Sequence, residues 1–257
     1  MLQAHSLLWH YLWVAPNLLL LGLALLIWRR GSAREIPAFV AFAVFSALGD
    51  LAVYAADLLP SVTAANFWRV DWASLLIESL LKFAVIGEVF SRVFNPYPAV
   101  SKLGRISVSG FGVVLILMAA LLAAFSRGDS NERLISGAHL LEQTVFIIET
   151  GLILFLFVLA GYFQLSLDRI SFGLLLGFGL SASAYLGSWA LMTNAHLSAR
   201  GRTLLDFLNM GTYHGCVLIW LYYLLVPGKS GPKPSVPPPD NNGLEVWNRE
   251  LERLVHP

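Results

Sequence analysis

The sequence predicts an all-α membrane protein, a bundle of seven transmembrane helices with its N-terminus outside the membrane and its C-terminus inside. Of its 257 residues, 57% are hydrophobic and 13% are charged, whereas a soluble domain carries about 25% charged residues. The apolar residues lie in continuous runs, without the period-two alternation of barrel strands. A net charge of +1 provides no basic surface that would indicate nucleic-acid binding.

The first predicted span lies close to the N-terminus, and its arginines, Arg29 and Arg30, follow the apolar run. This order is typical of a retained span and not of a cleaved signal peptide. A helix needs about 20 mostly apolar residues to cross a hydrocarbon core of about 30 Å. Residues 1–227 contain seven runs of this kind. The predicted spans are 6–28, 36–58, 70–94, 104–126, 134–160, 170–194 and 203–226.

The predicted orientation follows from the basic residues of the short connections, which are enriched on the inner side of a membrane. With the N-terminus outside, the inner segments hold nine Lys and Arg residues and the outer segments hold five. The first inner connection, with Arg29, Arg30 and Arg34, supplies much of the difference. Arg200 and Arg202, in the last outer connection, argue for the opposite orientation.

Beyond the last span, residues 228–242 are rich in proline and predict an extended linker. Residues 243–257 then predict a short amphipathic helix, which would be marginal alone and should dock on another surface. Its polar face is nearly balanced in charge, which favours a protein surface over anionic lipid. We expect it to bind the inner face of the bundle or a cytoplasmic partner, although a disordered tail is the alternative interpretation. The predicted docking residues are Leu244, Trp247, Leu251 and Leu254.

Small residues recur along the sixth span at a spacing of four, at Gly173, Gly177 and Ser181, and Tyr185 continues the series. Such a stripe allows close approach of a second helix. We expect the partner to be a helix of the same bundle, and a homodimer contact is the alternative.

Ionisable residues at membrane depth are costly and usually face a bundle interior or a water-filled cavity. Here they come from the second, third, fifth and seventh spans. With a rise of 1.5 Å per residue, Asp50, Glu78 and Glu142 each lie roughly 12 Å from the outer end of their span, and Lys82 roughly 18 Å. The predicted pocket residues are Asp50, Glu78, Lys82, His139, Glu142, Glu149, Asp206, Asn209 and His214.

This set predicts an outward-facing polar pocket that binds a small ligand or ion, as in a receptor or sensor. Glu78 and Lys82 are four residues apart and can pair on one helix face. The acidic residues outnumber Lys82, so at neutral pH some carboxyl groups should be protonated or a cation should be present. The competing interpretation is structural, with these groups forming interhelical polar contacts that hold the bundle together. No cofactor is predicted.

Two further functions are open from the sequence. A proton- or ion-coupled transporter would use Glu142 and Glu149 as a relay, although the spans show no inverted repeat, and Pro16 and Pro37 lie near predicted span ends. A structural or scaffold subunit would act through its C-terminal helix.

The sequence predicts no enzyme and no metal site. An intramembrane hydrolase would need three firm metal ligands, and the only approach to such a motif is His139-x-x-Glu142. A retinal protein of the rhodopsin families would carry its lysine in the last span, whereas the only lysine at membrane depth here is Lys82 in the third span.

Several segments carry a resemblance to a known group of proteins. They are ESLLKFAVIGEVF, NPYP, LILFLFVLAGYF, LLLGFGLSAS, VLIWLYYLL and LEVWNRELERL. Over most of its length the chain resembles a group of uncharacterised bacterial seven-span membrane proteins. The resemblance implies a seven-helix fold in the bacterial inner membrane and implies no chemistry.

Overall fold

A computed structural model describes residues 6–59, 61–94, 130–162, 165, 167–194 and 198–226, together with positions 106, 110, 113, 114 and 117. Within these residues the chain is all-helical and contains no strand. The elements are α1 (Leu7–Arg29), the short 3-10 helix η1 (Ser32–Arg34), α2 (Pro37–Leu58), α3 (Ala64–Val93), α5 (Ser130–Tyr162), α6 (Arg169–Asn194) and α7 (Ala199–Leu225).

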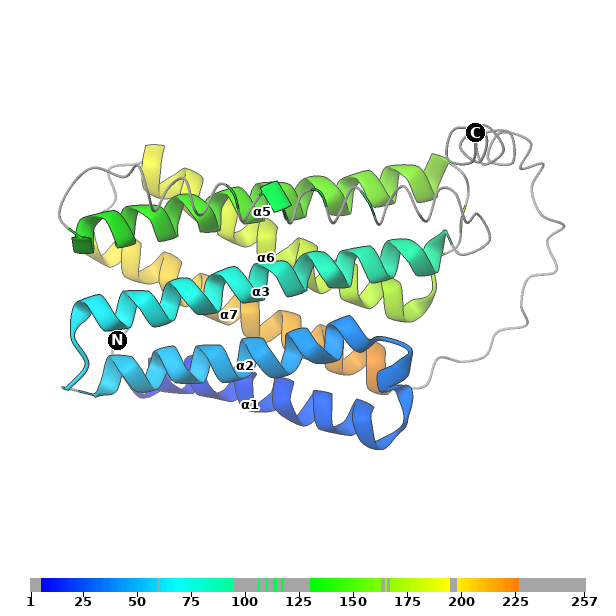
Figure 1. The fold of residues 1–257 in the computed structure, drawn as a ribbon, viewed down its shortest axis with the longest axis horizontal. Coiled ribbons are helices and arrows are strands. Elements are labelled where there is room, and N and C mark those ends of the chain that lie inside the picture. Colours follow the sequence, from blue (N-terminus) through cyan, green and yellow to red (C-terminus); the bar gives the residue numbers. More distant parts are fainter. Residues whose placement is uncertain are drawn as a thin grey trace, which may run out of the picture.

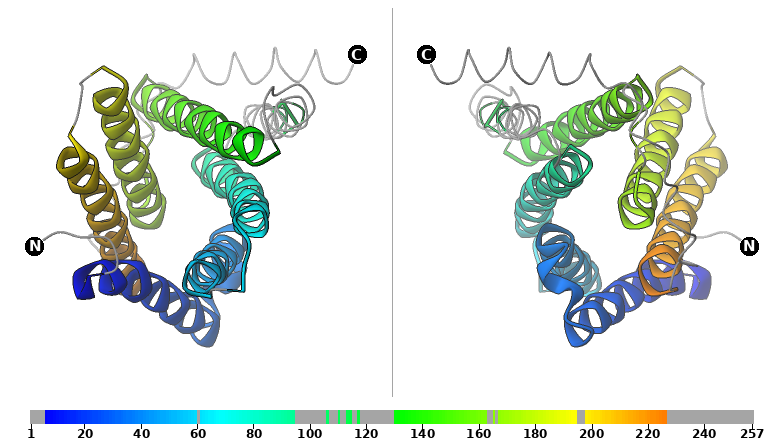
Figure 2. Two further views of the ribbon diagram at one scale, coloured as in Figure 1. Left: turned by 90° about the vertical axis from the view of Figure 1, so that its left-hand side faces the viewer. Right: turned by 90° about the vertical axis from the view of Figure 1, so that its right-hand side faces the viewer.

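The six long helices lie side by side, and successive helices run in opposite directions except for α3 and α5, which run the same way (Figure 1). Viewed along the bundle they form a closed ring, in which each helix contacts the next and α7 returns to α1 (Figure 2). α3 contacts α5 directly. The predicted span 104–126 lies outside the described residues except for five helical positions, so the seventh helix of the bundle stays a prediction.

Four helical segments are long and apolar enough to cross a membrane, which indicates a membrane protein. They are Leu7–Arg29, Pro37–Leu58, Glu142–Tyr162 and Arg169–Met192. α3 and α7, with 30 and 27 residues, are also long enough, but they carry several of the ionisable residues. That these two helices also span the membrane is still a prediction.

Exposure is distributed as in a protein that faces lipid. On α5 the Val158 side chain is 67% exposed and Leu154 is 58% exposed, whereas Glu149 is 0% exposed. Large apolar side chains also line the outer faces of α1, α6 and α7. A continuous apolar exterior around buried ionisable groups is the arrangement expected in a bilayer.

Polar N-caps precede the apolar runs, so α3 and α7 begin earlier than predicted, whereas α1 begins within one residue of its predicted start. Ser6, Thr63 and Ser198 accept backbone amide hydrogen bonds in the first turns of α1, α3 and α7. A span estimated from apolar content alone stops before such N-caps. The expectation that Pro16 lies near a span end was wrong, because it is buried well inside α1, whereas Pro37 does start α2.

At the opposite end of the bundle, long side chains tie neighbouring helices together. The Glu88 carboxylate accepts the amide of Ala38 at 3.1 Å, at an α2 N-terminus whose own N-cap residue makes no side-chain bond. Arg92 pairs with Asp168 at 3.6 Å. Arg30 donates to the carbonyl of Leu225 at 3.0 Å and so satisfies the C-terminus of α7.

The hydrophobic core fills this same end of the bundle. Its centre is an aromatic cluster of Phe39, Phe42, Phe178 and Trp220, with ring centroids 4.9 to 6.1 Å apart. Trp220 fits over Gly177 on α6, where an added Cβ would overlap its indole, and Tyr223 lies against Gly173 in the same way. The small-residue stripe is thus a contact within the bundle.

Candidate functional site

A central cavity of about 220 Å³ lies inside the ring of helices, on the N-terminal side of the aromatic cluster. α2, α3 and α5 contribute its charged residues, and α6 and α7 complete the wall. Phe42, Phe178 and Trp220, members of the aromatic cluster, form one boundary of the cavity. The ionisable side chains that line it are Asp50, Glu78, Lys82, Glu142 and Tyr185, together with Tyr213.

Lys82 is the cationic group of this cavity. Its ammonium lies 3.0 Å from the Glu78 carboxylate, one helical turn away, as the spacing predicted. The same ammonium lies 4.8 Å from the ring centroid of Phe146, within the range of a cation–π contact. Both members of the ion pair are largely buried, with side-chain exposures of 12% and 18%. Lys82 is therefore held between α3 and α5.

Glu142 is linked to the same aromatic group through Tyr185. The Phe146 ring stacks on Tyr185 of α6 at 4.2 Å, with 26° between the ring planes. The Tyr185 hydroxyl forms a side-chain hydrogen bond with Glu142. Lys82 and Glu142 thus each contact one ring of the same stacked pair, and each charge has a partner of its own.

Asp50 belongs to a polar network that joins α1, α2 and α7. Its carboxylate forms a side-chain hydrogen bond with Asn17. Asn17 also donates to the carbonyl of Trp13 at 2.9 Å and accepts from the Tyr213 hydroxyl at 3.2 Å. Asn17 is only 1% exposed. Asp50 and Tyr213 line the central cavity and also the second cavity of this region.

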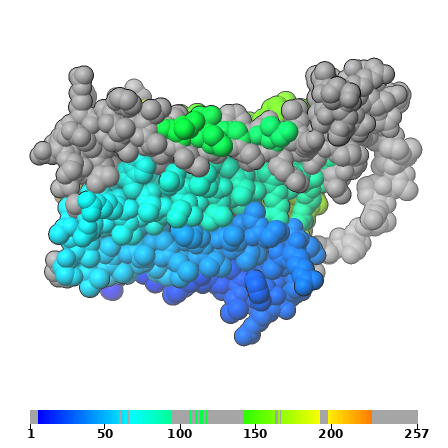
Figure 3. All heavy atoms as spheres, in the orientation of Figure 1, coloured from blue at the N-terminus to red at the C-terminus, as the bar shows by residue number. Residues whose placement is uncertain are grey.

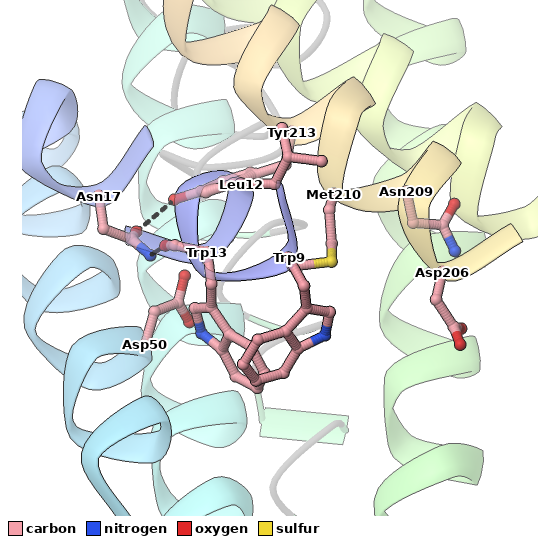
Figure 4. A pocket seen from close by; sticks show the side chains of 9 residues that line it. All are labelled: Trp9, Leu12, Trp13, Asn17, Asp50, Asp206, Asn209, Met210 and Tyr213. Atoms are coloured by element: carbon pink, nitrogen blue, oxygen red, sulfur yellow. Dashed lines mark hydrogen bonds between the residues drawn. The ribbon is translucent and has the colours of Figure 1, made fainter. Parts of the chain in front are cut away.

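The second cavity, which we call the tryptophan cavity, has a volume of about 400 Å³ and lies between α1, α2 and α7. Figure 4 shows the indoles of Trp9 and Trp13 beside Asp50, with Asp206 and Asn209 on α7 across from them. The Asn209 amide oxygen accepts from the Ser188 hydroxyl of α6 at 2.8 Å. On the face of the molecule seen in Figure 3, α2 and α3 form a continuous surface.

The structure therefore brings together many of the predicted pocket residues. Asp50, Glu78, Lys82 and Glu142 line the central cavity, Asp206 lines the tryptophan cavity, and Asn209 lines both. That a ligand binds there stays a prediction.

Two predicted residues, Glu149 and His214, lie elsewhere. Glu149 is fully buried beyond the cavity, within Coulombic range of Lys82 but with no hydrogen-bond partner among the described residues. His214 lines neither of these cavities, and its ring lies 5.7 Å from Tyr11 at the contact of α7 with α1. The side chain of His139 and the predicted docking residues of the C-terminal helix lie outside the described residues.

Four residues that line the cavities or join their network were not predicted at all: Asn17, Tyr213, Trp9 and Trp13. Tyr185 was predicted only as part of the sixth-span stripe. A search restricted to ionisable groups passes over an asparagine in the middle of an apolar run, although a buried amide needs partners just as a carboxylate does. Tyrosines at membrane depth carry the same signal. The tryptophans offered none, since this residue is common near membrane interfaces.

The distribution of charge makes the bundle asymmetric. The half of the bundle at the end that holds the N-terminus contains the cavities and their carboxyl groups. The other half is packed with buried apolar side chains, among them Leu23, Ile86, Phe90, Leu156 and Leu174. Within the described part of the chain, no three His, Cys, Asp or Glu side chains are grouped so that they could hold a metal ion.

Comparisons with protein-family models, with curated proteins and with solved structures found no match to this chain.

Proposed function

We propose that this chain is a receptor- or sensor-like membrane protein that binds a small ligand or ion in a polar pocket facing the outside of the cell. The pocket consists of the central cavity and the tryptophan cavity. The single observation that carries the proposal is the meeting of Asp50, Glu78, Lys82 and Glu142, from three helices, around one cavity.

A structural role alone does not account well for this arrangement. Interhelical polar contacts stabilise a bundle most when the groups pack directly against each other, without space between them. Here each charged group has its own partner, and the partners still leave about 220 Å³ between the helices. Side chains held in place around a space in this way are typical of a preformed binding site.

The proposed location is the bacterial inner membrane, with the cavities on the outer side. Arg29, Arg30, Arg34 and Arg169 lie at the bundle end away from the cavities, as the enrichment of basic residues on the inner side requires. α7 ends at that same end, at Leu225, and we expect the segment 243–257 to dock on a cytoplasmic partner or on the bundle.

The test is a ligand screen with the purified full-length chain in lipid nanodiscs. A panel of small amines, carboxylates, sugars and inorganic ions is added at millimolar concentration, and the unfolding temperature is recorded for the wild type, Asp50→Asn, Glu142→Gln and Glu35→Gln. Asp50 lines both cavities and Glu142 the central one, whereas Glu35 is an exposed carboxylate at the opposite end of the bundle. We expect a compound that stabilises the wild type and Glu35→Gln but fails to stabilise Asp50→Asn, Glu142→Gln or both. Equal stabilisation of all four proteins, or of none, contradicts the proposal.

A proton-coupled transporter is the alternative, and Glu149 is the observation that favours it. A fully buried carboxyl group without a hydrogen-bond partner among the described residues resembles the proton-carrying groups of transporters. The aromatic cluster beside it argues against a continuous path. Proton flux into liposomes that is abolished by Glu149→Gln would favour transport, and the absence of flux favours the pocket.

A scaffold subunit is the remaining alternative. It predicts that deletion of residues 243–257 releases a partner from the membrane while substitutions in the cavities change nothing.

A further inference from the structure

The tryptophan cavity has a chemical character that differs from that of the central cavity. Its wall combines the indoles of Trp9 and Trp13 and the phenol of Tyr213 with the carboxyl groups of Asp50 and Asp206. No Lys, Arg or His is among its lining residues, whereas the central cavity contains Lys82. Its surroundings are therefore acidic and aromatic.

We propose that the tryptophan cavity binds a small organic cation that carries a substituted ammonium group. This inference rests on the proposed function and names the ligand class of the same pocket. The faces of aromatic rings carry negative potential, and an ammonium group within about 6 Å of a ring centroid is attracted to it, most strongly for tryptophan. Carboxylates nearby supply the compensating charge.

The geometry of the two indoles suits a compact cation. The ring centroids of Trp9 and Trp13 are 4.5 Å apart and their planes meet at 71°, so the rings form a corner and not a flat stack. Trp13 is further positioned by Asn17, which donates to its carbonyl oxygen. A rounded group with several methyl substituents can contact both walls of such a corner at once. Aromatic cages for quaternary ammonium groups are built in this way.

Other ligands fit this cavity less well. An inorganic divalent cation needs a tight group of ligands, and the described residues contain no such group of His, Cys, Asp or Glu. An anion would meet carboxyl groups with no lining basic residue. The volume of about 400 Å³ lies within the range of small-molecule sites, about 300 to 1,000 Å³.

The test is equilibrium binding of radiolabelled choline to the purified full-length chain in nanodiscs, with unlabelled competitors. Tetramethylammonium chloride should displace the label. Its neutral analogue 3,3-dimethyl-1-butanol, in which a carbon atom replaces the ammonium nitrogen of choline, should not, and neither should glucose nor sodium chloride of equal ionic strength. Displacement by the neutral alcohol or by glucose at the same concentration would overturn the proposal.

Four variants locate the site. Trp13→Leu and Asp50→Asn should each weaken choline binding at least tenfold, whereas Trp28→Leu and Asp57→Asn should leave it unchanged. Trp28 and Asp57 are exposed residues on the same two helices and line neither cavity. If Trp13→Leu does not fold, Trp13→Phe serves in its place and should keep part of the affinity. Equal binding by all four variants, or no saturable binding by the wild type, contradicts the inference.

These outcomes separate the inference from the proposed function. If choline does not bind while the ligand screen finds another compound that depends on Glu142, the organic-cation proposal fails and the pocket remains. If neither experiment finds a ligand, both fail.

Discussion

Lys82 illustrates how the chemistry of single residues shapes this bundle. The spacing of four residues predicted its pairing with Glu78, because that distance along a helix brings two side chains to one face. The cation–π contact with Phe146 could not be predicted, since it depends on which face of α5 turns toward α3. The same is true of Glu88, which accepts the Ala38 amide and so caps α2, a contact between residues 50 positions apart in the sequence. Local spacing shows which partners are within reach, and tertiary packing decides among them.

Lys82→Met should destabilise the bundle strongly, because it leaves the Glu78 carboxylate buried without its cation. Removing one partner of a buried ion pair costs about 3 to 5 kcal/mol, whereas replacing both partners by apolar groups is often close to neutral. The double variant Lys82→Met/Glu78→Leu should therefore recover most of the loss.

Unfolding of these variants in mixed detergent micelles measures the effect. Arg202→Met, which removes an exposed cation from α7, is the control and should change stability by less than about 0.5 kcal/mol. A single Lys82→Met variant as stable as the wild type would show that the ion pair is not buried in the folded protein.

Asn17 provides a second test at this scale. Asn17→Leu should cost about 1 to 3 kcal/mol, the usual penalty when buried hydrogen-bonding partners are left unsatisfied. Tyr213→Phe should cost less, because it removes the hydroxyl group that donates to Asn17 and leaves the bond to Asp50. A double-mutant cycle in the same unfolding assay would show additive losses if the two residues did not interact, and we expect the losses to be less than additive.

At the scale of elements, the sequence predicted the positions of six helices well, because long apolar runs flanked by polar breaks have few alternatives in a chain of this composition. The first turns of α3 and α7 were missed, since N-cap chemistry and not hydropathy sets where these helices begin. The contact of α6 with α7 was predicted only as a stripe of small residues, and its partner, the Trp220 indole, became clear from the structure.

Gly177→Ala should destabilise the contact between α6 and α7, because the new Cβ overlaps the buried Trp220 indole. Overpacking of this kind typically costs about 1 to 3 kcal/mol. Gly187→Ala on the same helix is the matched control, with no atom within 4 Å of the added Cβ. It should be neutral or stabilising by up to about 1 kcal/mol, since alanine favours helix more than glycine does. Thermal unfolding of both variants measures the two effects. Equal stability of the two variants would mean that α6 and α7 do not pack at Gly177.

At the scale of the whole molecule, the predicted depths of Asp50, Glu78, Lys82 and Glu142 placed them at one level, and the structure brings them to one cavity. His214 was also predicted as a pocket residue but lines neither cavity, because the level of a residue along a helix does not fix the direction of its side chain. The other half of the bundle is filled by buried apolar side chains. The aromatic cluster that fills its centre depends on four side chains from three helices, and no local pattern connects them.

We propose that the polar pocket opens to the side of the membrane that holds the N-terminus and is closed toward the other side. Cysteine accessibility tests it most directly, because a membrane-impermeant thiol reagent reacts only where water reaches. Ala184→Cys places a thiol in the central cavity, and Ala182→Cys on the same helix places one in the packed core. Both are made with the single native cysteine replaced, as Cys216→Ala.

The two variants are compared in right-side-out and inside-out vesicles. We expect Ala184→Cys to be modified only when the reagent is added on the side that holds the N-terminus, and Ala182→Cys to be modified from neither side. Modification of Ala184→Cys from both sides, or from neither, would contradict this proposal.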